Sequence, residues 1–192
     1  MLKIGVLSPK NSTEIVEALI SLIKSKNLLV AVKKNNPRIF SELSFFSECG
    51  IDFSIIVFEK SAVYPIDLDI LILDNEYREQ IVSYDLIRCI GEKTFLIYNT
   101  DNDTLPLIEH PNAIDYGYSA KSSVTISSID YTDNEISFII SVQREFSGIY
   151  NNRLEIGEFL IKSKFIANVT NILPAVICCI VSDIIKYAVV KI

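Results

Sequence analysis

Short aliphatic runs alternate with helix-like segments through the first half of the chain, and this order constrains the fold more than any other feature. The runs lie at residues 2–7, 28–32, 53–58, 68–73 and 95–98. Most lack polar–apolar alternation, which is typical of strands covered on both faces. Helical spacing occupies residues 12–25, 38–49 and 76–90 between them. This order predicts a mainly parallel sheet with right-handed crossovers and helices on both faces.

The pattern changes after residue 118. Segments 123–131, 135–143 and 153–161 are longer and alternate polar with apolar residues, with turn-forming residues between them, which predicts an antiparallel meander. A last helix is expected from about residue 168 to 186. Because no repeat or linker-like tract interrupts the chain, we expect one three-layer α/β domain over residues 1–192, with a small antiparallel sheet beside the parallel one.

Composition excludes several functional classes. With 192 residues, 49% of them hydrophobic, the chain can bury one good core. The net charge is −6 and the eighteen Lys and Arg residues are scattered, so we expect no nucleic-acid binding. The four cysteines show no CxxC spacing, and the only histidine, His110, has no Cys or His nearby in sequence. We therefore expect neither a zinc site nor a catalytic triad.

The N-terminal residues lack the pattern of a signal peptide, and adjacent Cys178 and Cys179 in an apolar run are typical of free thiols in a reducing compartment. A cytoplasmic location is the expectation. Residues 172–192 are apolar enough to raise the question of a membrane span. Asp183 and Lys186 interrupt this stretch, and a span needs about 20 largely uncharged residues. We favour a buried helix, with membrane insertion as the minor alternative.

The turn Ser8-Pro9-Lys10-Asn11-Ser12-Thr13 joins the first run to the first helix. A phosphate-binding loop at this place needs glycines at its bends and a lysine at the helix start, so that N–H groups and an ammonium close on phosphate. Here Ser8 and Asn11 occupy the glycine positions, and Ser12 occupies the lysine position. The turn has the position of a phosphate loop without its chemistry.

Four local motifs, in order, resemble the central ATP-binding domain of the Mur ligase family. They are G-V-L-S-P-K-N-S-T at 5–13, I-I-V-F-E-K-S at 55–61, N-T-D at 99–101 and N-V-T-N-I-L-P-A at 168–175. They match the family's G-T-x-G-K-[ST] turn, its strand ending in a magnesium-linked Glu, its N-x-D after a strand, and its N-V-x-N-x-L-A-A beside adenine. The family comprises ATP-dependent amide ligases of peptidoglycan synthesis, with folylpolyglutamate synthase and cyanophycin synthetase as relatives.

The resemblance implies a nucleotide site and a magnesium site, both vestigial. The nucleotide site would consist of Lys10, Asn11, Ser12, Thr13, Asn168 and Asn171, and the magnesium site of Thr13 and Glu59. The positions at which this sequence departs from the family pattern are those that the family uses for catalysis. Leu86 or a neighbour stands where the family has a carbamylated lysine, and residues 73–77 lack the histidine of the family's T-N-x-x-x-D-H. We therefore assign no catalytic residue.

A structural interpretation competes at each of these positions. Asn11 followed by Glu14 resembles a capping box, which would use the N–H groups that a phosphate needs and would place a carboxylate that repels a triphosphate. We favour this interpretation, although Lys10 could partly replace the lost lysine. Glu59 could hold hydrated magnesium at a strand end, or it could pair with Lys60 or stand solvated. Asn168 and Asn171 suit the N-cap and first turn of the last helix.

Two hypotheses of function follow. In the first, the domain is a catalytically inactive relative that acts through protein contact or residual ligand binding, with no cofactor. In the second, it is a diverged ATP-dependent carboxylate–amine ligase or nucleotide-binding subunit, which uses ATP and magnesium and is completed by a partner chain. The family's flanking domains are expected to be absent, so faces that they cover would be left open. We therefore expect a homodimer or a tight hetero-complex.

Overall fold

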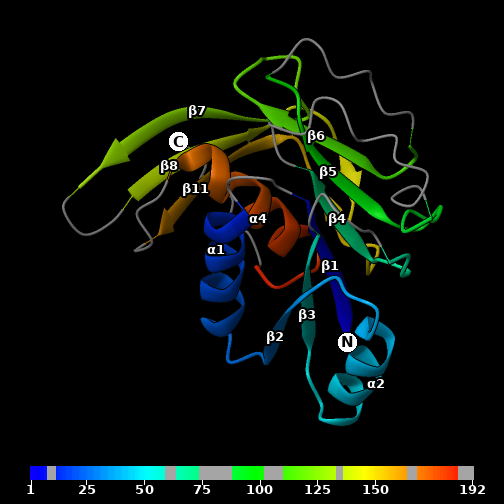
Figure 1. Ribbon diagram of the computed structural model, residues 1–192. Helices are drawn as coiled ribbons and strands as arrows, with labels where there is room; N and C mark the ends of the chain where they lie inside the picture. The colour runs from blue at the N-terminus through cyan, green and yellow to red at the C-terminus, as the bar shows by residue number, and fades with distance from the viewer. Residues whose placement is uncertain are drawn as a thin grey trace.

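The computed structural model describes residues 1–7, 12–58, 64–73, 88–101, 110–132, 136–163 and 168–185. In these ranges, nine strands form one sheet in the order β11-β8-β7-β6-β5-β4-β1-β3-β2 (Figure 1). Their bounds are β1 (Leu2–Leu7), β2 (Val30–Lys34), β3 (Phe53–Phe58), β4 (Ile70–Leu73), β5 (Phe95–Asn99), β6 (Ala113–Gly117), β7 (Val124–Tyr131), β8 (Ile136–Val142) and β11 (Gly157–Ser163). Pairing is parallel from β2 through to β7. The expected mainly parallel α/β fold is confirmed.

Helices cover both faces of this sheet. Helices α1 (Ser12–Lys24) and α4 (Val169–Val181) lie side by side on one face, and α2 (Ile39–Glu48) lies on the other (Figure 1). The β1 strand shows how sequence produces the layers: Ile4 and Val6 join the core around α1 and α4, whereas Leu7 joins the core around α2. A Cβ at Gly5 would come within 2.6 Å of a Leu68 methyl carbon, so a larger residue here would force the side chains packed against β1 to shift.

The meander predicted after residue 118 extends the large sheet. Strands β7, β8 and β11 pair antiparallel, and a separate two-stranded sheet consists of β9 (Phe146–Ser147) and β10 (Arg153–Leu154). In β8 every second side chain is buried while those between are partly exposed. The alternation of polar and apolar residues in the sequence therefore reflects a sheet that is covered on one face only.

Some elements differ from the expected ones. The segment expected as one strand at 153–161 is divided between β10 and β11. Strand β6 was not expected, because its five residues include Asp115 and Gly117 and form no aliphatic run. The helix expected at 76–90 lies outside the described residues except for its last three positions, 88–90, which are not helical.

The last helix is buried, as the sequence indicates. In α4, all but one of the residues from Val169 to Val181 are buried, because the helix packs against α1 on one side and against β4, β5 and β6 of the sheet. Within the described ranges, no helix combines the length and hydrophobicity that a membrane span requires. Burial raises the pKa of the Cys179 thiol to about 12, and burial together with Cys179 raises the pKa of Cys178 well above its usual value. Both side chains therefore pack as neutral hydrophobic groups.

Candidate functional site

The first turns of α1 and α4 form the candidate site. Helix α1 follows β1 directly, so its first turn lies beyond the carboxyl ends of the parallel strands, where open α/β sheets bind ligands. The first turn of α4 lies beside it, because Asn171 Nδ2 donates a hydrogen bond of 2.7 Å to Glu14 Oε2 across 157 positions of sequence. The fold thus brings together the two segments that the resemblance assigns to a nucleotide site.

Glu14 is half-buried and Asn171 is buried, with 7% of its surface exposed. The partial positive charge of a helix N-terminus attracts anions, and Glu14 supplies a carboxylate in the first turn of α1. Asn171 fixes that carboxylate in place. The site therefore already holds a negative group where a phosphate would be attracted.

Asn168 has the structural role that its sequence position predicts. It is the N-cap of α4, with extended backbone angles of φ −60° and ψ 127°. Its Oδ1 accepts hydrogen bonds from the Thr170 backbone N–H at 3.2 Å and from the Thr170 hydroxyl at 2.9 Å. The acceptor atom of this side chain is thus used for capping.

The structure places only some of the other predicted site residues. Thr13 lies in the first turn of α1 with its side chain exposed, and Ser12 begins that helix. Lys10, Asn11 and Glu59 lie outside the described residues, so the capping box and the Thr13–Glu59 magnesium site stay predictions. In the part of the chain that the structure describes, no group of three or more His, Cys, Asp or Glu residues could hold a metal ion.

The N-x-D motif links the end of β5 to the loop after β6. Asn99 is buried and its Oδ1 accepts the Asp101 N–H at 2.7 Å, while Asp101 Oδ1 accepts the Tyr118 N–H at 2.6 Å. A Cβ at Gly117 would lie 2.4 Å from Asp101 Oδ1, so any larger residue here would displace this carboxylate from its bond to Tyr118. The motif therefore shapes the chain between β6 and β7.

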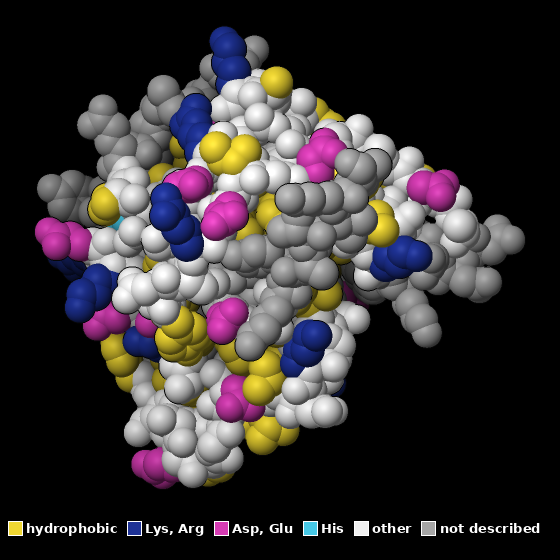
Figure 2. Space-filling model, turned by 180° about the vertical axis from the view of Figure 1, so that it is seen from behind, with side chains coloured by type: hydrophobic (Ala, Val, Ile, Leu, Met, Phe, Trp, Pro, Cys, Tyr) yellow, Lys and Arg dark blue, Asp and Glu magenta, His cyan; other side chains and the backbone are white. Residues whose placement is uncertain are grey.

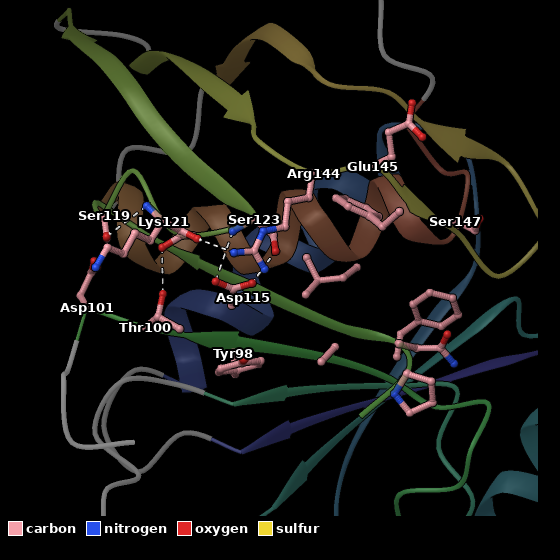
Figure 3. A pocket seen from close by; sticks show the side chains of 17 residues that line it. Tyr98, Thr100, Asp101, Asp115, Ser119, Lys121, Ser123, Arg144, Glu145 and Ser147 are labelled. Carbon is pink, nitrogen blue, oxygen red and sulfur yellow. Dashed lines mark hydrogen bonds between the residues drawn. The ribbon is translucent and has the colours of Figure 1, made fainter. Parts of the chain in front are cut away.

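That chain borders a cavity of about 980 Å³, which the sequence did not predict (Figure 3). Its walls include Tyr98 of β5, Asp115 of β6, Lys121 of the following loop and Arg144 after β8. Burial, followed by the charge of Asp115, raises the pKa of the Tyr98 phenol, and Arg144 partly opposes this shift. The four residues come from separate segments and form no motif, so no signal in the sequence marks them as one site.

Comparisons with known proteins bear on the fold. No protein-family model matches the chain, and no curated protein matches it. Its structure is similar to that of a UDP-N-acetylmuramoyl-L-alanyl-D-glutamate–2,6-diaminopimelate ligase, with a TM-score of 0.68 and 16% identity over 95% of this chain and 44% of that one. It is also similar to MurF from Acinetobacter baumannii, with a TM-score of 0.64 and 12% identity over 99% and 44% of the two chains.

A third similar structure is folylpolyglutamate synthetase from Lactobacillus casei, with a TM-score of 0.56 and 8% identity over 95% of this chain and 58% of that one. The chain thus spans about half the length of these enzymes. At such low identities the similarity shows the fold alone. The expected resemblance to the central domain of Mur ligases is confirmed at the level of fold.

Proposed function

We propose that this Mur ligase-like domain does not turn over ATP and that it acts by binding, through a protein partner or a residual ligand. The bond between Glu14 and Asn171 carries this proposal. It joins the two first turns at which a nucleotide would bind, and it holds a carboxylate there. A triphosphate approaching this edge would meet a fixed negative charge.

The sequence of the turn supports the same conclusion. Ser12 stands where a phosphate loop has its lysine, and hydrogen bonds from a charged donor contribute about 1.5–3 kcal/mol each. Loss of the lysine and gain of a carboxylate act in the same direction. Together they predict that nucleotide affinity is lost or very weak.

Exposed hydrophobic side chains support a role in protein contact. Phe40 and Phe45 of α2 are 62% and 59% exposed, and Leu29 just before β2 is 55% exposed. Figure 2 shows hydrophobic side chains between acidic and basic ones on the rear face of the molecule. Aromatic side chains such as Phe40 and Phe45 are enriched in protein interfaces relative to the rest of the surface.

The alternative is a diverged ATP-dependent amide ligase or nucleotide-binding subunit, completed by a partner chain and linked to peptidoglycan precursor metabolism. Its support is the fold, since the ligases named above share the arrangement of sheet and helices. In that case, Thr13 would lie beside the phosphates and Asn171 near the base.

Calorimetric titration with Mg-ATP separates the two functions. We expect no saturable binding up to about 1 mM nucleotide, which corresponds to less than about 4 kcal/mol of binding free energy. A low-micromolar isotherm would overturn the proposal in favour of the alternative. Glu14→Gln would then alter the affinity, whereas Glu17→Gln would not, because Glu17 is exposed on the same helix beyond its first turn.

A further inference from the structure

The wall of the cavity formed by Tyr98 and Asp115 lies on the face of the sheet opposite α1 and α4. Strands β5 and β6 pair in register, with Tyr98 beside Asp115. Ile97, Ile114 and Tyr116 alternate with these two residues and belong to the core around α1 and α4. Tyr98 and Asp115 therefore point to the other face, and the cavity is separate from the first turns that carry the proposed function.

The cavity runs along the strands from an apolar end to a polar one. Phe95 at the start of β5 lines one end together with Pro111, Asn112 and Ala113 at the start of β6. Thr100, Ser119 and Lys121 line the other end, beyond the carboxyl ends of these strands. Between the two ends, Asp115, Ser123 and Arg144 lie together in Figure 3. A ligand that fills the cavity thus meets hydrophobic and charged groups in turn.

The carboxylates of the cavity already have donors. Asp115 Oδ2 accepts the Ser123 backbone N–H at 3.2 Å, and Asp115 Oδ1 accepts the Ser123 hydroxyl proton. Asp101 accepts the Tyr118 N–H, and Glu145 is paired with Arg153. The Thr100 hydroxyl contacts the Tyr116 carbonyl at 3.2 Å and the Ser122 hydroxyl at 2.8 Å.

The donors of the cavity are less fully used. Arg144 Nη2 donates to the Lys121 carbonyl oxygen at 3.2 Å, and within the described ranges neither Arg144 nor Lys121 has a carboxylate within 4.0 Å. Among the described residues, the Tyr98 hydroxyl takes part in no hydrogen bond. Because the pKa of Tyr98 is raised, this hydroxyl keeps its proton at neutral pH. Two cations and one phenol thus remain available to a ligand.

We propose that the cavity binds a small organic anion, a carboxylate or a phosphate, through Arg144, Lys121 and Tyr98. The apolar part of the ligand lies along the strands toward Phe95 and Pro111, and its anionic group accepts hydrogen bonds from the free donors. The volume of about 980 Å³ is at the upper end of the range for small-molecule sites. Charge-assisted bonds to a guanidinium or ammonium favour the anion over a neutral molecule of the same shape.

Titration of the protein, without nucleotide, with four probes tests this site. Phenylphosphonate and phenylacetate carry the two anions on one apolar ring, benzyl alcohol is neutral, and inorganic phosphate lacks the ring. We expect saturable binding, with a dissociation constant below about 1 mM, for at least one aromatic anion. Binding is monitored through the NMR chemical shifts of the backbone amides in β5, β6 and the loop after β6. Tighter binding of phenylphosphonate would indicate a phosphate head group in the ligand, and tighter binding of phenylacetate would indicate a carboxylate.

If benzyl alcohol bound as tightly as the aromatic anions, the role assigned to the charged donors would be wrong. If inorganic phosphate bound as tightly as the aromatic anions, the role assigned to the apolar end would be wrong. Absence of binding by both aromatic anions up to 1 mM would overturn the site itself. None of these results depends on whether the first turns of α1 and α4 bind ATP, so the two proposals fail separately.

Variants locate the anion. Arg144→Gln should weaken binding of the aromatic anion at least about tenfold, and Tyr98→Phe about three- to tenfold. The matched control is Arg38→Gln, which makes the same change of charge at the N-cap of α2, away from the cavity. Circular dichroism confirms that each variant is folded. Equal losses in Arg144→Gln and Arg38→Gln would show that general electrostatics, and not this cavity, attracts the anion.

Discussion

At the scale of single residues, the bond between Glu14 and Asn171 should be measurable as a coupling energy. We expect a double-mutant cycle of Glu14→Ala and Asn171→Ala, read from urea unfolding, to give about 1–2 kcal/mol, because a part-buried amide donates to a carboxylate at 2.7 Å. The control cycle pairs Asn171→Ala with Glu17→Ala and should be additive. A coupling near zero in the first cycle would show that the bond does not hold the two first turns together.

Sequence alone could predict part of this site. The N-cap role of Asn168 follows from the residue type and its place before an apolar run, and the structure confirms it. The partner of Glu14 could not be predicted, since no local rule connects residues 157 positions apart. Tyr98 and Arg144 were missed for a related reason: their proximity depends on strand order and on the loop after β8.

At the scale of elements, the aliphatic runs predicted the parallel strands well. Strands β1 and β3 have the expected bounds, because strands buried on both faces must be apolar throughout. Strand β6 was missed because its alternate face opens to the cavity, where Asp115 replaces an aliphatic residue. The cavity thus explains both the polar side chain and the failure of the pattern to reveal the strand.

The cysteines of α4 should make the protein less stable in alkali. The folded-state pKa of Cys179, about 12, lies above its unfolded value of about 8.5, so its contribution is complete below pH 8.5 and is lost as the pH rises toward 12. The direction is the same for Cys178. We expect the free energy of unfolding to fall by about 1.4 kcal/mol per pH unit for each thiol.

Urea midpoints measured in reducing buffer from pH 8 to 10.5 check this slope. Replacing both Cys178 and Cys179 by alanine should flatten it, whatever the cost in absolute stability. Cys49→Ser should leave it unchanged, because Cys49 is exposed. An identical slope in the double variant would assign the alkaline loss to other groups.

At the scale of the whole molecule, we expect the exposed hydrophobic side chains Phe40 and Phe45 of α2 to promote self-association. We expect light scattering to give a mass of about twice 21.6 kDa at high protein concentration. Phe40→Glu and Phe45→Glu together should shift the equilibrium toward the monomer, because a charge in a contact must be desolvated. A monomer at all accessible concentrations in the unchanged protein would contradict this prediction.

The pairing of α1 with α4 also sets the order in which the chain can fold during synthesis. The apolar side of α1 includes Ile15, Leu19 and Ile23, which are fully buried in the core that it shares with α4, and it is made about 150 residues before α4. At ~5–20 residues per second, α1 waits roughly 8–30 s on the ribosome before α4 can cover it. Throughout that interval the α4-facing side of α1 is not yet covered, so α1 is enclosed only long after it has been translated.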